Sequence, residues 1–150
     1  MFKSFISLFT FLMIALSAFG QNSGIGIGLS VDGISGKYWM SETNAVAVNW
    51  NLGSNLSADY LFDMPELLKI TDNTTPVYYG GGIALGTHKG LNDDLEETTE
   101  LDLGVRGVIG LGYYLSDYNL DIFIESTPTL KISGGGGFGF GGNLGVRYFF

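Results

Sequence analysis

The chain has 150 residues, enough for one domain, and carries 7 basic against 15 acidic residues. The net charge of −8 argues against binding to nucleic acid, because phosphate contacts need clustered lysine and arginine. The sequence contains no cysteine, which excludes disulfides, thiol chemistry and lipid attachment through a thiol.

The first 20 residues have the layout of a secretory signal peptide. Lys3 is followed by an uncharged apolar stretch over residues 5–16, and Ala18 and Gly20 place small side chains before a cut at Gln21. The alternative is a retained anchor, although the stretch is short for a membrane-spanning helix. We expect residues 1–20 to be removed and residues 21–150 to form the mature domain, with six basic and fifteen acidic residues and a net charge of −9.

Glycine is unusually frequent, with 24 residues in 150, against a usual share of about 7%. Proline occurs only three times, so the chain is neither collagen-like nor a proline-rich linker. Most glycines lie inside stretches in which apolar residues alternate with small ones, which indicates a structural role.

This alternation predicts eight β-strands, because a period of two places successive side chains on opposite faces. The predicted segments are residues 24–31, 35–40, 45–52, 55–62, 77–86, 101–113, 120–125 and 138–150. Seven charged residues fall within them, all opposite the apolar side chains: Lys37, Asp59, Asp102, Arg106, Asp121, Glu125 and Arg147.

The small and polar face of these strands predicts a closed antiparallel transmembrane β-barrel with the charges in its lumen. A soluble sandwich would carry many lysines, glutamates and threonines on its polar face, whereas this face is mostly Gly, Ala, Ser and Asn. Eight strands enclose just enough room for side chains, and in lipid an open edge is not tolerated. A soluble carrier with an apolar cavity is the alternative, but large apolar residues occupy the inward positions only at Leu61, Val108, Phe123 and Phe149.

The connections between strands fit this fold. Residues 41–44, 51–55 and 116–119 predict short polar turns, and residues 63–75 a longer connection with helical turns at 65–70. Residues 87–100 form an acidic segment and residues 133–137 a Ser-Gly run. With both termini in the periplasm, we expect 87–100 to be a mobile loop outside the cell and 63–75 to face the periplasm.

Aromatic residues near strand ends are typical of the interfacial girdles of membrane barrels. They are Trp39, Trp50, Tyr60, Phe62, Tyr79, Tyr113 and Tyr148. The chain also ends on an alternating strand with a terminal phenylalanine. We expect Leu144, Val146, Tyr148 and Phe150 to form the signal that the barrel-assembly machinery of the outer membrane recognises.

An ordered set of short motifs resembles a known group of proteins. The motifs are residues 33–39, 59–61, 78–82, 104–106, 121–125 with Pro128, and 145–150. They resemble the small eight-stranded outer-membrane barrels that include the OmpA membrane domain and OmpX, and more closely a family of short, poorly characterised outer-membrane barrels. The resemblance implies a barrel in the outer membrane of a Gram-negative bacterium, and it implies no catalytic activity.

The sequence offers little for catalysis, metal binding or a cofactor, and none is expected. The only histidine is His88, no G-x-S-x-G element occurs, and Gly134–Gly137 lacks the Lys-Ser/Thr of a phosphate loop. Oxygen ligands for calcium are present, but their spacing matches no EF-hand loop. They are Asp93, Asp94, Glu96, Glu97 and Glu100.

The lumen charges carry the functional hypotheses. Three cations face four acids, and we expect Arg106 and Arg147 to flank Asp121 and Glu125. Such ion pairs would form a plug, because buried charges must be paired and eight strands leave little bore. The favoured function is a monomeric structural or surface-interaction barrel in contact with outer-membrane lipid, with its loops available to an extracellular ligand. The alternatives are a narrow, porin-like path for small ions and, less favoured, an outer-membrane enzyme acting on lipid.

Overall fold

The computed structural model describes residues 24–52, 54–64, 75–91, 97–133 and 136–150. Three predictions concern segments outside these residues: the signal peptide at 1–20, the helical turns at 65–70, and calcium ligands at Asp93, Asp94 and Glu96. They stay predictions.

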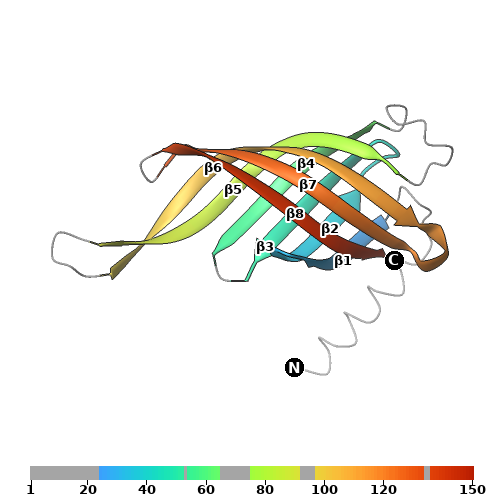
Figure 1. Ribbon diagram of the computed structural model, residues 1–150, viewed down its shortest axis with the longest axis horizontal. Coiled ribbons are helices and arrows are strands. Elements are labelled where there is room, and N and C mark those ends of the chain that lie inside the picture. Colours follow the sequence, from blue (N-terminus) through green and yellow to red (C-terminus); the bar gives the residue numbers. More distant parts are fainter. Residues whose placement is uncertain (1–23, 53, 65–74, 92–96, 134–135) are drawn as a thin grey trace, which may run out of the picture.

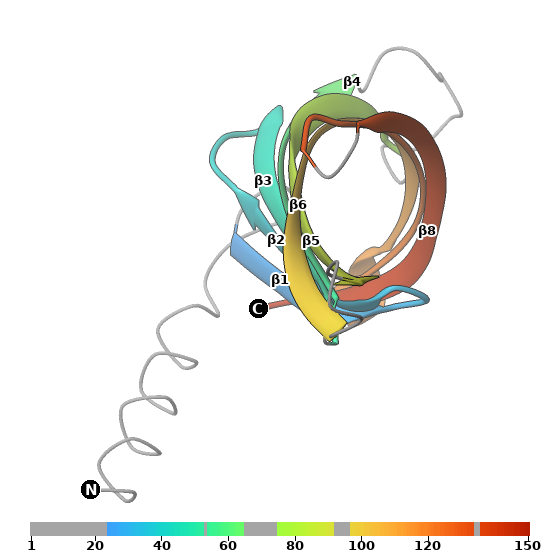
Figure 2. The same ribbon diagram turned by 90° about the vertical axis from the view of Figure 1, so that its left-hand side faces the viewer.

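The described chain forms an all-β, closed antiparallel barrel of eight strands, as predicted (Figures 1 and 2). The strands are β1 (Gly24–Ser30), β2 (Gly33–Trp39), β3 (Asn44–Asn51), β4 (Asn55–Met64), β5 (Val77–Leu91), β6 (Glu97–Leu115), β7 (Leu120–Lys131) and β8 (Gly137–Phe149). Each strand pairs with its neighbours in the sequence, and β8 closes the barrel on β1. Within the described residues, no helix has both the length and the apolar character needed to cross a membrane.

The register of the closed sheet is sheared along the barrel. From Phe149 the pairing runs around the barrel through Gly26, Lys37, Ala47, Asp59, Gly82, Arg106 and Thr129, and it returns to β8 at Gly139, ten residues before Phe149. Eight strands with this shear tilt by about 40° against the barrel axis. The interior of such a barrel is narrow enough for side chains to fill.

Glycine relieves crowding in this interior, which gives the frequent glycines their structural role. A Cβ on Gly26 would lie 2.6 Å from the ring of Phe149, and one on Gly145 would lie 2.6 Å from the ring of Phe123. A Cβ on Gly110 would overlap the ring of Tyr78. Bulky inward rings therefore fit only because a neighbouring strand has no side chain beneath them.

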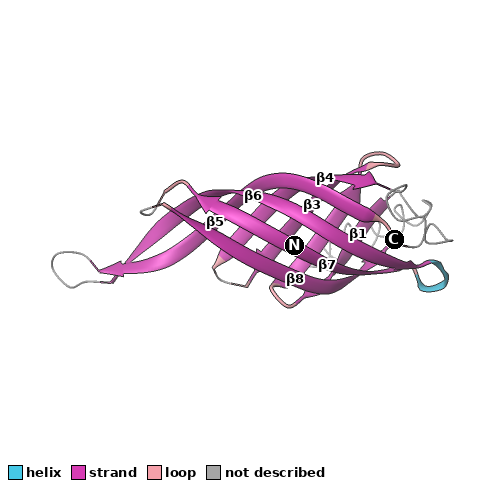
Figure 3. Ribbon diagram, turned by 45° about the horizontal axis from the view of Figure 1, so that its top comes forward, coloured by secondary structure: helices cyan, strands magenta, loops and turns pink. Residues whose placement is uncertain are grey.

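The barrel has two ends and two walls of unequal height. The terminal end carries the C-terminus and the short 3₁₀ helix Ser116–Tyr118, and the hairpin end carries the β5–β6 hairpin (Figures 1 and 3). The short wall, β1 to β4, has strands of 7 to 10 residues, and the tall wall, β5 to β8, has strands of 12 to 19. The ladder between β1 and β8 runs from Gly145 to Phe149, and the N–H of Val31 donates a further hydrogen bond to the carbonyl of Leu144. The described part of β8 before Leu144 therefore extends beyond β1.

The tall wall corrects two predicted boundaries. Residues 87–100 were expected to be a loop, but β5 runs to Leu91, β6 starts at Glu97, and these two residues pair with each other. Strand β7 likewise continues past Glu125 to Lys131. In the β5–β6 extension the sequence has no clear apolar alternation, and in β7 Pro128 interrupts it, so neither extension was predicted.

Candidate functional site

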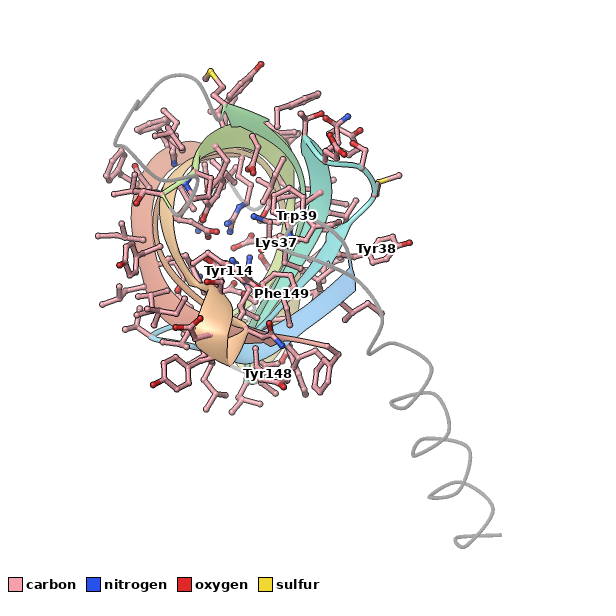
Figure 4. The ribbon with its side chains drawn as sticks, turned by 90° about the vertical axis from the view of Figure 1, so that its right-hand side faces the viewer. Lys37, Tyr38, Trp39, Tyr114, Tyr148 and Phe149 are labelled. Atoms are coloured by element: carbon pink, nitrogen blue, oxygen red, sulfur yellow. The ribbon has the colours of Figure 1, made fainter. Side chains whose placement is uncertain are left out.

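Three aromatic side chains close the lumen at the terminal end. Trp39, Tyr114 and Phe149 are 7%, 8% and 5% exposed and lie inside the barrel, whereas Tyr38 and Tyr148 point outward (Figure 4). The rings of Tyr114 and Phe149 meet edge to face at a centroid distance of 6.1 Å. Trp39 was predicted to join an outer aromatic girdle, and this was wrong, because its odd-numbered position on β2 faces inward.

Lys37 packs against this group of rings. Its ammonium is 4.1 Å from the centroid of the Trp39 ring and 4.5 Å from that of Tyr78. Within the described part of the chain, Lys37 contacts these ring faces rather than forming an ion pair. Cation–π contacts of this kind stabilise a desolvated cation.

Arg147 is the centre of the lumen network and is fully buried. Its Nη1 lies 3.4 Å from Asp121 Oδ2, and its Nη2 lies 3.2 Å from Glu125 Oε1. Its Nε donates a hydrogen bond of 2.9 Å to Ser35 Oγ, and its guanidinium carbon is 3.5 Å from the centroid of the Phe123 ring. One guanidinium thus bridges the lumen from β8 to β7 and to β2.

Two further hydrogen bonds extend the network to other strands. Tyr78 donates its hydroxyl to Glu125 Oε1 at 2.8 Å, and Ser35 donates its hydroxyl to Asn49 Oδ1 at 2.6 Å. We use the name plug for the connected residues Ser35, Asn49, Tyr78, Asp121, Glu125 and Arg147. The plug links β2, β3, β5, β7 and β8, so it ties both walls of the barrel together.

Arg106 does not take part in the plug, contrary to expectation. Its Nε forms an ion pair of 3.0 Å with Asp59 Oδ1. The register explains this pairing, because Asp59 and Arg106 flank Gly82, which leaves the space between them free. On the other side Arg106 pairs with Thr129, four positions closer to the hairpin end than Glu125.

A fourth ion pair lies near the hairpin end. Lys131 Nζ is 3.5 Å from Asp102 Oδ2, and its side chain is half exposed. Lys131 was missed in the sequence, because Pro128 interrupts the alternation after Glu125. Its parity could have revealed it, since Thr127, Thr129 and Lys131 continue the inward row of Asp121 and Glu125.

A cavity of ≈ 400 Å³ with a mixed polar and apolar wall occupies the lumen between the plug and the hairpin end. We call this cavity the cup. Its wall carries amides and hydroxyls from Asn49, Asn51, Asn55, Ser57, Thr127 and Thr129. The charged residues on it are Asp32, Asp102, Arg106 and Lys131, and Gly104, Gly139 and Gly141 leave parts of the wall without side chains.

The predicted assembly signal lies on the outer face of β8 and at its end. Leu144, Val146 and Tyr148 point away from the lumen and are exposed. The backbone N–H of Phe150 donates a hydrogen bond of 3.1 Å to the carbonyl of Ile25, and its ring contacts Tyr148 at 5.1 Å between centroids. The last residue of the chain therefore takes part in the closure between β8 and β1.

The residues that the sequence analysis weighed for catalysis and for metal binding were His88 and the acidic residues between 93 and 100. His88 belongs to β5, but its side chain lies outside the described residues. Among the residues that are described, no three potential metal ligands come together.

The lumen therefore contains a closed half and an open half, and the predicted charges are divided between them. No model of a protein family, no curated protein and no solved structure matches this chain. Its function has to be inferred from its own lumen and its own outer surface.

Proposed function

We propose that this chain is a small outer-membrane β-barrel that spans the bilayer with a plugged lumen. In this proposal it is a structural or surface-interaction protein of a Gram-negative envelope, exported through a cleaved signal peptide, and neither an enzyme nor an open pore. Its partners are the surrounding lipid and, through the last strand, the barrel-assembly machinery.

The observation that carries the proposal is the inverted distribution of side chains. Large apolar residues lie exposed on the outer face of every strand, among them Leu29 at 71%, Ile109 at 62% and Phe138 at 73%. Soluble monomers rarely expose continuous apolar patches larger than a few hundred Å². An apolar belt outside and ion pairs inside are what a barrel in lipid requires.

The plug supports a closed rather than a conducting lumen. Arg147 is held by two acids and a hydroxyl, so a solute must displace a fully buried, paired charge. The cup favours the channel alternative, because open space lined by charged and polar side chains among others leads down to the plug from the hairpin end. Conduction then depends on whether Arg147 leaves its partners.

Spin labels test the membrane position. Labels at Val46, Val48 and Leu103 should report lipid, and labels at Asn49 and Asp102 should not, because the two sets face opposite sides of the sheet. Val48 and Asn49 form a matched pair of neighbours on β3. A lipid signal at Asn49 and Asp102 with none at the other three sites would reject the membrane assignment.

Planar-bilayer recording tests the closed lumen. The purified protein should give no channel or at most a small, poorly selective conductance, and Arg147→Ser should raise it, because that substitution removes the centre of the plug. Steady channels of porin size from the unaltered protein would refute the plug and favour the channel alternative.

Proteolysis of intact cells tests the orientation. With both termini in the periplasm, residues 92–96 should be cut from outside, and residues 65–74 should be spared. Cleavage at 65–74 alone would invert the topology.

A further inference from the structure

We propose that the cup binds a short neutral saccharide at the hairpin end of the barrel. This ligand site does not depend on the membrane assignment, because binding can be measured on the purified barrel.

The cup has the closed floor and open mouth of a binding site. The plug lies beneath it, and its ≈ 400 Å³ are bounded by strands of both walls. Figure 2 views the barrel from this end. Small-molecule sites typically measure about 300–1,000 Å³, so the cup is suited to a mono- or disaccharide rather than to a polymer.

Both cations on the wall are paired with acids, which argues for a neutral ligand, and the remaining charged residue, Asp32, is exposed in the turn between β1 and β2. Arg106 is paired with Asp59 at 3.0 Å, and Lys131 is paired with Asp102 at 3.5 Å. An anionic ligand would have to compete with the two acids for Arg106 and Lys131. A cationic ligand would have to compete with the two basic residues for Asp59 and Asp102. A ligand rich in hydroxyls needs neither, because each hydroxyl can both donate and accept a hydrogen bond.

Asn49 lies at the floor of the cup with its amide held in one direction. Its Oδ1 accepts the hydrogen bond from Ser35, which fixes the direction of the amide. Its Nδ2 is buried and has no hydrogen-bond partner among the described residues, although Asn49 lines the cup and is only 7% exposed. Nδ2 is covered by the wall of the cup, so the Asn49 amide reports on the floor of the cup rather than donating directly to a ligand.

Hydroxyls and bare backbone complete the site. Ser57 and Thr127 are buried on the wall of the cup and can donate to or accept from a sugar. A Cβ on Gly139 would meet only Thr129 O, at 3.9 Å, so this part of the wall is open to a ring that approaches the backbone. These hydroxyl groups and the accessible backbone at Gly139 match the hydroxyl groups and the ring of a sugar.

The experiment is NMR titration of the purified full barrel with maltose in a detergent without sugar head groups. Maltose should shift the side-chain amide resonance of Asn49 and saturate in the millimolar range. Inorganic phosphate serves as an anionic probe and glycine as a zwitterionic probe. Both should leave the Asn49 resonance unchanged.

Two variants of one strand make the test specific. Gly139→Leu fills the cup and should weaken maltose binding at least about tenfold. Gly142→Leu is the matched control, because it makes the same change on the exposed outer face, where a Cβ meets only a backbone oxygen at 3.6 Å. It should bind maltose as the unaltered barrel does.

Thr127→Val removes a buried hydroxyl from the wall without adding volume, and it should also weaken maltose binding. This variant keeps the test valid if Gly139→Leu fails to fold. The proposal is overturned if maltose leaves Asn49 unchanged, if phosphate or glycine binds instead, or if folded cup variants bind maltose like the control. In each of these cases the cup is not a site for a neutral saccharide.

Discussion

The terminal and hairpin halves of the lumen are built by the same strands but packed in opposite ways. In the terminal half, aromatic rings and the Arg147 network fill the barrel, and glycines on neighbouring strands make room for them. In the hairpin half, the same inward rows continue with Gly, Ala, Ser, Thr and Asn and leave a cavity of ≈ 400 Å³.

The difference shows that strand number sets the bore of a barrel and side-chain volume decides whether the bore is closed. On β8, Phe149 and Arg147 close the terminal half, and Gly141 and Gly139 open the hairpin half. The two halves should therefore differ in how much each substitution costs.

Arg147→Leu should have the largest effect. It leaves Asp121 and Glu125 buried without their cation, and breaking a buried ion pair in this way costs about 3–5 kcal/mol. The free energy of unfolding in urea, followed by the fluorescence of Trp39 and Trp50, measures it. A loss no larger than that of Lys131→Leu in the open half would remove the distinction between the halves.

Glu125→Gln should cost less, about 2–3 kcal/mol, because one charge-assisted bond is weakened while others remain. Arg147 keeps Asp121, and Tyr78 can still donate to the amide oxygen. The same unfolding measurement applies, with Asp102→Asn as the control in the half-exposed pair. An effect equal to that of Arg147→Leu would mean that Asp121 gives Arg147 no support.

Gly110→Ala should destabilise the barrel by about 1–2 kcal/mol through overpacking against Tyr78. Gly139→Ala makes the identical change in the cup and should stay within about 0.5 kcal/mol, because the new methyl group meets only Thr129 O, at an ordinary contact distance of 3.9 Å. Thermal unfolding of the two variants side by side compares the packing of the two halves. Equal losses would contradict an open cup.

Lys131→Met should have the smallest effect, under about 1 kcal/mol, since exposed ion pairs contribute little. The loss should also shrink as salt is raised, which screens exposed charges. Unfolding at low and high ionic strength checks this. A large loss that is independent of salt would show that the pair is buried.

Much of this arrangement could be predicted from the sequence, because alternation specifies which side of a strand each residue occupies. All seven predicted charges belong to the inward rows, and Leu61, Val108, Phe123 and Phe149 are buried there. Register could not be predicted, since it depends on the shear of the closed sheet. The pairing of Arg106 with Asp59 across Gly82 therefore appeared only in the structure.

Alternation also failed to predict strand ends where apolar residues no longer occur at every second position. Pro128 and the threonines around it hid the continuation of β7, and with it Lys131. Polar residues on both sides hid the extension of β5 and β6 into the hairpin. Trp39 shows a different error, because its size suggested an outer girdle although its parity on β2 placed it in the lumen.

If the barrel spans a bilayer, as we propose, its unequal walls have a mechanical consequence. On the tall wall, exposed apolar side chains reach up to Leu101, Ile132 and Phe138, whereas on the short wall they end near Val31 and Leu52. A bilayer of constant thickness matches a belt of uneven height when the barrel axis leans or when the lipid beside the shorter side thins. The barrel would thus have a preferred lean in the bilayer, with a defined direction set by β1 and β2 on one side and by β6 and β7 on the other.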